Sequence, residues 1–198
     1  MIEVEIRGPL ARKDYVRIKK LLETAGDGVR TEKRIVVDYS REPYESRTIA
    51  ISLKQKNDVP VVVVKTGKSG DFVVREEHEV ALASGEFTNA VKLFASLGYV
   101  KALVGVRELF FARYGGAEFK LVDPGEDLFY YEAEMQVKTG SEATEAKKKL
   151  EVLARNLKLP VWGQGEMLTF IHELDKRVSY VYDYTEQGAD HFREKFGI

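Results

Sequence analysis

The stretch Ile2-Glu3-Val4-Glu5-Ile6-Arg7 alternates strictly between apolar and charged residues. Successive side chains of an extended strand point to opposite faces, so Glu3, Glu5 and Arg7 share one face. An apolar face opposite them can pack on a core. The charged face then meets either bulk solvent or a polar interior, and the rest of the sequence must decide between the two.

Two more predicted strands carry acidic residues at every second position. They are Arg75-Glu76-Glu77-His78-Glu79 and Glu132-Ala133-Glu134. Any one such row is typical of a solvent-exposed sheet face. Paired carboxylates repel and raise each other's pKa unless cations lie between them. The neighbouring strands supply such cations, namely Lys54, Lys56, Lys65 and Arg107. Together these rows predict a barrel lined by charge, because a barrel filled by apolar side chains would show the reverse alternation.

The order of the elements predicts an internal duplication. Residues 11–25 and 86–97 have the spacing of amphipathic helices. Each follows one strand and precedes three; the expected strands span 2–7, 33–39, 47–55, 60–66, 72–82, 100–113, 117–122 and 128–138. A helix over 141–158 with Ser141 as N-cap follows, then two shorter helices over 160–198. We therefore expect an α+β fold in which duplicated β-α-β-β-β units form an eight-stranded antiparallel tunnel barrel with flanking helices.

Composition excludes several classes of protein. The chain has 198 residues, a formal net charge of −1 and no cysteine. The charge argues against a dedicated nucleic-acid or anionic-membrane binder. The lack of cysteine excludes disulfides, zinc–thiolate sites and cysteine nucleophiles. The chain opens on a strand, without a signal peptide or an apolar stretch that could span a bilayer, so we expect a cytoplasmic protein.

The charged interior has a definite chemistry. Mg²⁺ and Mn²⁺ prefer oxygen ligands, and Mg²⁺ is usually held by a few carboxylates together with substrate phosphates. Lysine and arginine bind phosphate oxygens. Phosphoryl transfer needs mainly positioning and charge stabilisation, so no serine or cysteine nucleophile is required. The sequence therefore predicts a site for Mg²⁺ or Mn²⁺ and a polyphosphate.

At these residues the chain resembles the CYTH superfamily, the triphosphate tunnel metalloenzymes. The stretch from Glu3 to Arg7 is similar to the family's opening Glu-x-Glu-x-Lys, with arginine in place of lysine. The other matches, in family order, are Lys65 before a glycine turn, Arg75 to Glu79, Arg107, and Asp123 followed by Glu132 and Glu134. The resemblance implies a tunnel domain over residues 1–175 and a C-terminal helical extension over 176–198.

The resemblance also implies roles for individual residues. The metal ligands would be Glu3, Glu5, Glu132 and Glu134, assisted by Asp123 or Glu77. The triphosphate would be held by Arg7, Lys54, Lys56, Lys65, Arg75 and Arg107. Arg7 and Lys65 would be the catalytic residues.

Several functions remain open from the sequence. The first is metal-dependent hydrolysis of inorganic triphosphate, a nucleoside triphosphate or thiamine triphosphate. The second is an adenylate cyclase of class IV, and the third is a non-catalytic module that binds polyphosphate or nucleotide. A lipocalin-like barrel with an apolar cavity would instead turn the Glu-x-Glu rows outward. The expected partner is a small triphosphate compound, with neither nucleic acid nor membrane, and the helical tail could form a homodimer contact.

Overall fold

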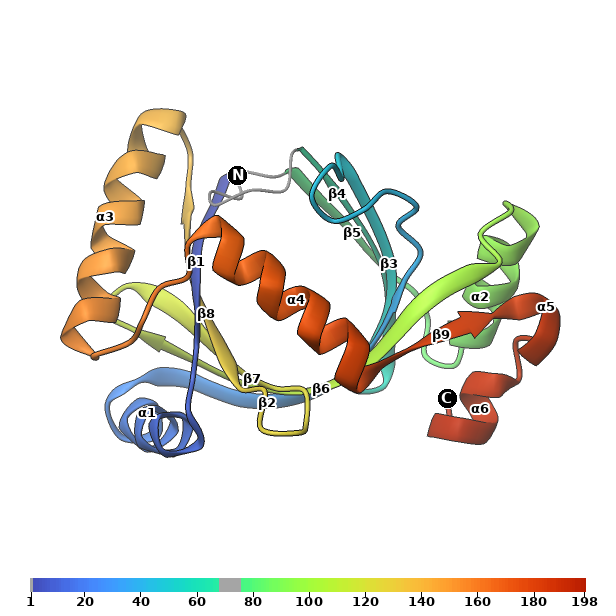
Figure 1. The fold of residues 1–198 in the computed structure, drawn as a ribbon, viewed down its shortest axis with the longest axis horizontal. Coiled ribbons are helices and arrows are strands. Elements are labelled where there is room, and N and C mark those ends of the chain that lie inside the picture. Colours follow the sequence, from blue (N-terminus) through green and yellow to red (C-terminus); the bar gives the residue numbers. More distant parts are fainter. Residues whose placement is uncertain (1, 68–75) are drawn as a thin grey trace.

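The computed structural model describes residues 2–67 and 76–198. Its main feature is one strongly curled antiparallel sheet with helices outside it (Figure 1). The strands are β1 (Ile2–Pro9), β2 (Asp27–Asp38), β3 (Ile49–Lys56), β4 (Val59–Thr66), β5 (Glu76–Ala81), β6 (Lys101–Tyr114), β7 (Ala117–Asp123), β8 (Tyr130–Val137) and β9 (Ser179–Asp183). The helices are α1 (Arg12–Ala25), α2 (Phe87–Ser96), α3 (Gly140–Asn156), α4 (Gln164–Val178), α5 (Tyr184–Gln187) and α6 (His191–Phe196).

The strand order confirms the predicted duplication. The sheet runs β1-β8-β7-β6-β2-β3-β4-β5, with β9 added beside β6. Exchanging β1–β4 for β5–β8 reproduces this order in reverse. The first strand of each unit therefore lies beside the last strand of the other unit, and Arg34 pairs with Arg107 at the junction of β2 and β6. The α+β fold expected from the sequence is confirmed.

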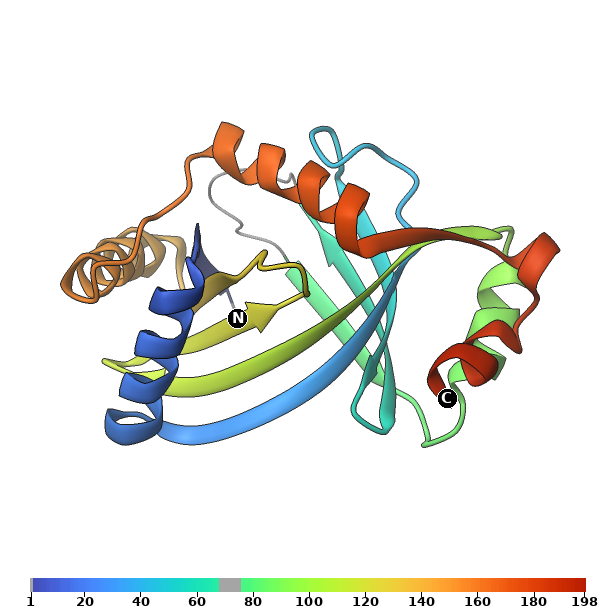
Figure 2. The same cartoon turned by 60° about the horizontal axis from the view of Figure 1, so that its bottom comes forward.

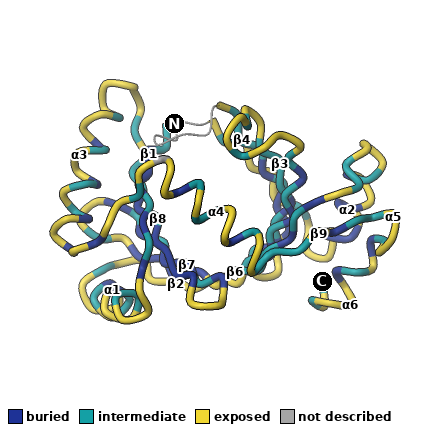
Figure 3. Tube along the Cα trace, in the orientation of Figure 1, coloured by how far each residue is buried: buried dark blue, intermediate teal, exposed yellow. Residues whose placement is uncertain are grey.

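The curl brings the two ends of the sheet toward each other. In the described part of the chain no backbone ladder joins β1 to β5. Yet Lys65 on β4 lies close enough to Glu3 and Glu5 on β1 for their charges to raise the pKa of its ammonium. Figure 3 shows the resulting ring, whose wall contains most of the buried residues.

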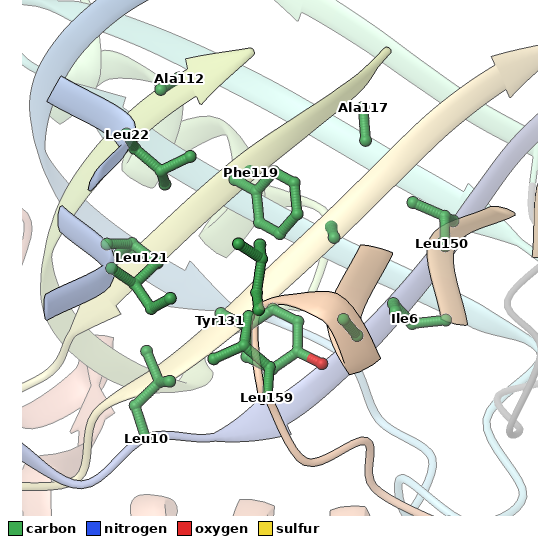
Figure 4. Packing of buried hydrophobic residues seen from close by; sticks show 14 of the residues in the cluster. Ile6, Leu10, Leu22, Ala112, Ala117, Phe119, Leu121, Tyr131, Leu150 and Leu159 are labelled. Atoms are coloured by element: carbon green, nitrogen blue, oxygen red, sulfur yellow. The ribbon is translucent and has the colours of Figure 1, made fainter. Parts of the chain in front are cut away.

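The outer face of one half of the ring is covered by α1 and α3. The alternation of β1 turns Val4 and Ile6 toward these helices. Figure 4 shows the core that results, in which Phe119, Leu121 and Tyr131 pack with Leu22 and Leu150. Burying such side chains stabilises the fold by roughly 1.5–3 kcal/mol each. The inward residues of the same strands are thereby fixed on the interior of the ring.

The outer face of the other half is covered by α2 and the C-terminal tail. Tyr39 on the chain after β2 stacks on Phe94 of α2, with ring centroids 4.5 Å apart. Phe87 of α2 meets Phe192 of α6 at 5.2 Å. The tail therefore contributes to a core rather than extending away from the sheet.

Two strands differ from the prediction. Strand β2 begins at Asp27 rather than residue 33, and residues 179–183 form β9 where a helix was expected. The start of β2 is polar on both faces because its inward residues line a charged interior, so apolar alternation is lost. Residues 179–183 are extended because Tyr180 and Tyr182 pack on the core on one face while Val181 on the other face is exposed.

Smaller differences concern the ends of elements. The N-cap of α3 is Thr139, whose hydroxyl accepts a hydrogen bond from the Glu142 backbone N–H, rather than Ser141. Residues 72–75 of one expected strand lie outside the described residues. The division of the chain at residue 175 stays a prediction. No described helix combines the length and the apolar character needed to cross a membrane.

Helix α4 lies across one opening of the ring (Figures 1 and 2). The chain that leads into it is fastened to β1 and β8. The Tyr131 hydroxyl donates a hydrogen bond to the Pro160 carbonyl at 2.9 Å, and the Trp162 backbone N–H donates to the Arg7 carbonyl at 2.8 Å. Gly8 permits this close approach, because a Cβ there would lie 1.9 Å from the Pro160 oxygen.

We predict that Gly8→Ala destabilises the protein. The added methyl group collides with backbone, so the expected loss is at least roughly 1–3 kcal/mol of unfolding free energy. Urea denaturation followed by tryptophan fluorescence measures it. The control is Gly140→Ala, where the new Cβ meets nothing within 4 Å, so its stability should stay the same or rise. Equal stability of Gly8→Ala and the wild-type protein would contradict the proposed packing.

Candidate metal and phosphate site

The inside of the ring is a charged cavity of about 600 Å³, called the central cavity below. Every one of strands β1 to β8 contributes to its lining. The sequence predicted many of the lining residues: Glu3, Glu5, Arg7, Lys54, Lys56, Lys65, Glu77, Arg107, Glu132 and Glu134. The Glu-x-Glu rows therefore face a shared interior, and a lipocalin-like barrel with outward-facing acids is excluded.

Three of these carboxylates form a cluster where β1 and β8 pair. Glu3, Glu5 and Glu134 each offer an oxygen, and these oxygens lie within 4.8 Å of one another. The backbone register explains the meeting, because Glu5 is directly opposite Glu134. Three carboxylates at this spacing are a donor set suited to Mg²⁺ or Mn²⁺.

Ionisation of the cluster is unfavourable in the absence of a bound cation. Burial raises the pKa of Glu134 to about 7, and a hydrogen bond shared with Glu3 contributes to the rise. Burial also raises the pKa of Glu5, with repulsion from Glu132 and Glu3 adding to it and the charge of Arg7 opposing it. Two carboxyl groups share a hydrogen bond only when a proton lies between them, and a divalent cation can replace that proton.

One buried oxygen of the cluster has no hydrogen-bond donor among the described residues. The Oε1 atom of Glu5 is in ion-pair contact with Arg7 Nη2 at 2.8 Å, yet the geometry does not make a hydrogen bond. Buried acceptors without a donor are rare in folded proteins. Arg7 offsets part of the charge of this oxygen but leaves its hydrogen-bonding capacity unused, so the three-carboxylate donor set fits a divalent cation.

Glu132 has different neighbours from the cluster. Its Oε1 lies 3.2 Å from Arg7 Nε, and its Oε2 lies 3.9 Å from Lys120 Nζ. Burial opposes its ionisation, but the charges of Arg7 and Lys120 outweigh burial and hold its pKa well below the usual range. Lys120 also forms an ion pair with Glu134. Glu132 is thus a permanent anion that positions Arg7 and Lys120 beside the cluster.

The part of the cavity wall formed by β3 and β4 carries three lysines, Lys54, Lys56 and Lys65. Lys65 Nζ is 2.5 Å from Glu77 Oε2, and Lys56 Nζ is 2.6 Å from Glu79 Oε2. Glu77 is therefore paired with a lysine and lies apart from the three-carboxylate cluster. Lys54 has no ion pair with a described residue. Burial, with repulsion from Lys65 among other cations, lowers its pKa to about 7.

Arg34 and Arg107 face each other across β2 and β6. Like charges directly opposite in a sheet are destabilising. Arg34 is partly compensated by Glu32 at 2.5 Å, and Arg107 donates a hydrogen bond to the Tyr130 hydroxyl at 3.0 Å. Two guanidinium groups brought together on the cavity wall form an attractive site for an anion with several oxygens.

Two expected site residues are not part of this arrangement. Asp123 is on the outward face of β7, where its charge acts on Tyr15 of α1 and its Oδ1 accepts a hydrogen bond from the Gly125 backbone N–H. The two-residue alternation of β7 explains this, because Glu118, Lys120 and Val122 are its inward residues. Arg75 lies outside the described residues.

Sequence reasoning missed other charged residues of the cavity. They are Arg30, Glu32, Arg34, Glu118 and Lys120. A usable signal existed, because Arg30, Glu32 and Arg34 alternate, as do Glu118 and Lys120. A strand that starts at residue 33 excludes Arg30 and Glu32, and Glu118 with Lys120 is an acid beside a base rather than a pair of acids.

Solved structures of other proteins have a fold similar to that of this chain. No family model matches the chain, and no curated protein matches it. Among solved structures, the PH1819 protein from Pyrococcus horikoshii has a TM-score of 0.64 at 21% identity, covering 86% of this chain and 99% of the other. A candidate adenylate cyclase from Vibrio parahaemolyticus has a TM-score of 0.60 at 13% identity, covering 80% and 90%.

A third structure carries a description of activity. HpAC1 from Hippeastrum, a candidate adenylyl cyclase with a dominant triphosphatase activity, has a TM-score of 0.57 at 15% identity, covering 86% and 96%. This chain has the fold of these proteins. The fold implied by the CYTH resemblance is therefore confirmed, whereas these identities carry no assignment of activity.

We predict that metal binding to the cluster depends on pH. Protons and cations compete for the same oxygens, and the pKa of Glu134 is raised to about 7. Mg²⁺ or Mn²⁺ should therefore raise the melting temperature more at pH 8 than at pH 5.5. Differential scanning fluorimetry with and without metal measures the shift.

The matched variant is Glu134→Gln, which removes the titrating group. It should lose most of the metal-induced shift at both pH values. If the metal raised the melting temperature of the wild-type protein equally at pH 5.5 and pH 8, the carboxyl groups with raised pKa values would not be the ligands.

Proposed function

We propose that this protein is a divalent-metal-dependent phosphoryl-transfer enzyme that hydrolyses a triphosphate-containing substrate. The observation that carries the proposal is the convergence of a three-carboxylate cluster and a basic wall in one cavity. Carboxylates without a phosphate-binding wall would suit a structural cation, and a basic wall alone would suit a simple anion site. Their juxtaposition matches what a metal–triphosphate complex needs.

The residues divide into two groups by charge. Glu3, Glu5 and Glu134 would hold Mg²⁺ or Mn²⁺, with Glu132 close by. A bound divalent cation would neutralise charge on the phosphate oxygens and polarise the reacting phosphoryl group. The proposed phosphate ligands are Arg7, Arg34, Lys54, Lys65, Arg107 and Lys120.

The chain's own part in the reaction is to orient and to stabilise charge. Hydrolysis forms a bond from a water oxygen to phosphorus and breaks the bridging P–O bond, and the leaving phosphate oxygen takes up the negative charge. Arginines that are already placed donate to the oxygens on which this charge grows, at little cost of reorganisation. Lys54, whose pKa of about 7 leaves it partly neutral without substrate, would be protonated beside the bound phosphates and donate to their oxygens. The proton that the attacking water loses passes to a phosphate oxygen or to solvent.

The same assay separates the competing functions. An adenylate cyclase would instead join the ribose 3′ oxygen to the α-phosphorus of ATP and expel pyrophosphate. A binding module would retain the triphosphate without turnover. The experiment incubates the protein and Mg²⁺ or Mn²⁺ with inorganic triphosphate, nucleoside triphosphates and thiamine triphosphate, and measures phosphate, pyrophosphate and cyclic AMP. Absence of phosphate release from all of them would overturn the proposal.

We predict that Glu5→Gln lowers kcat/KM for the best substrate by at least about 100-fold, because substitution of groups that merely orient a metal's ligands already costs about 10–100-fold. The amide keeps the shape of the side chain and removes the charge. The matched control is Glu145→Gln on the exposed surface of α3, which should retain full activity. Equal activity of Glu5→Gln and wild type would remove the cluster from the mechanism.

We further predict that metal-free binding of triphosphate at pH 8 takes up protons. Lys54 is largely neutral at that pH, and a bound polyanion favours its charged form. Calorimetry in buffers with different ionisation enthalpies measures the uptake. Lys54→Met should abolish most of it. An apparent enthalpy that does not change between buffers would contradict the placement of the phosphates beside Lys54.

A further inference from the structure

A second cavity of about 510 Å³ lies under α4 and is called the side cavity here. Its walls come from α4, from the β6–β9 ladder and from the chain that follows β2. Its size is within the range of about 300–1,000 Å³ that is typical of small-molecule sites. The position is fixed by a fork in the sheet, because β9 pairs with residues 101–105 of β6 and β7 pairs only from residue 108 onward.

The side cavity continues into the central cavity. The same five residues line both of them: Arg7, Tyr44, Arg107, Tyr130 and Glu132. Arg107 stands at the fork between β7 and β9, so its guanidinium lies where the two cavities meet. A ligand whose phosphates fill the central cavity can therefore extend a further group past Arg7 and Arg107 into the side cavity.

One wall of the side cavity is aromatic. The rings of Trp162 and Phe170 lie 4.5 Å apart, and Tyr130 lies 5.4 Å from Phe170. Trp162 and Phe170 are only half-buried, and Met167 and Leu174 complete the apolar surface. The lining of the central cavity is instead mainly charged, with Tyr44, Phe111 and Tyr130 as its aromatic residues among those described. The aromatic wall of the side cavity suits a flat organic group rather than more phosphate.

One carboxylate at this surface has no direct hydrogen-bond or ion-pair partner in the described part of the chain, although the charges of Arg107 and Arg47 act on it from farther away. Asp175 projects from α4 as a half-buried residue and makes no hydrogen bond or ion pair with a described residue. The other acidic and basic residues that line only the side cavity are paired: Asp38 with Arg47, Glu45 with His172, and Lys101 with Asp183. A half-buried carboxylate without a donor is costly, and an N–H donor of a ligand would satisfy it.

We propose that the side cavity binds the organic group of the substrate, a flat nitrogen heterocycle with N–H donors such as a nucleobase. The ring packs against Trp162 and Phe170, and Asp175 accepts a hydrogen bond from the ring's amino group. This inference rests on the proposed function, because the phosphates occupy the central cavity. It separates an organic triphosphate from inorganic triphosphate as the preferred ligand.

The experiment measures binding rather than turnover. Calorimetry with Mg²⁺ compares non-hydrolysable methylene-bridged analogues of ATP and of inorganic triphosphate, in wild type, Phe170→Ala and Asp175→Ala. Both variants should bind the ATP analogue about tenfold more weakly, as expected for lost base stacking or a lost hydrogen bond. Neither should change the affinity for the inorganic analogue. The matched control is Asp190→Ala on the exposed surface, which should bind both ligands as wild type does.

The possible results are distinguishable. If wild type binds the inorganic analogue as tightly as the ATP analogue, and the variants change neither, the side cavity has no role and the inference fails alone. If the variants weaken both ligands equally, they act through the central cavity and the inference also fails. If wild type binds neither analogue, the proposed function fails and the inference fails with it. Melting temperatures of the variants show that each remains folded.

Discussion

The structure depends on keeping many like charges inside one cavity. Carboxylates from β1 and β8 would repel each other in a low-dielectric interior, and the basic side chains of β3, β4 and β7 offset that repulsion. Arg7 of β1 forms ion pairs with Glu5 on the same strand and with Glu132 on the neighbouring strand β8. The compensation is incomplete at two places: Glu5 and Glu134 keep raised pKa values although Arg7 and Lys120 contact them, and Lys54 has a lowered pKa. These groups are the ones that a bound cation or anion would stabilise.

The duplicated topology creates this arrangement. The first strand of each unit lies beside the last strand of the other, so Glu5 of β1 meets Glu134 of β8 although they are far apart in sequence. The two outer cores hold the curl from outside and fix which residues face inward. The charged cavity is therefore a consequence of where the apolar residues are buried, because each strand has only two faces.

The C-terminal segment adds a second level of organisation. Strand β9 pairs with residues 101–105 of β6, before the residues that pair with β7. Helix α4 crosses the opening of the ring beside this fork. The central cavity supplies charge and the side cavity supplies an aromatic surface, and Arg7 and Arg107 belong to both. A substrate with a polar end and a flat organic end matches this sequence of environments.

The sequence by itself determined the alternating strands, the duplicated order and most of the cavity's charged residues, because two-residue periodicity fixes which side chains share a face. It placed Asp123 in the site wrongly, since a single carboxylate does not reveal the face it occupies, whereas Lys120 two positions from Glu118 did carry that signal. The first half of β2 lacks apolar alternation because its inward residues, Arg30, Glu32 and Arg34, line the charged cavity. Only the tertiary structure decided that Glu3, Glu5 and Glu134 meet, that Arg34 faces Arg107 and that the side cavity exists. These contacts join residues that are far apart in the sequence, and local sequence patterns do not specify which distant residues come together.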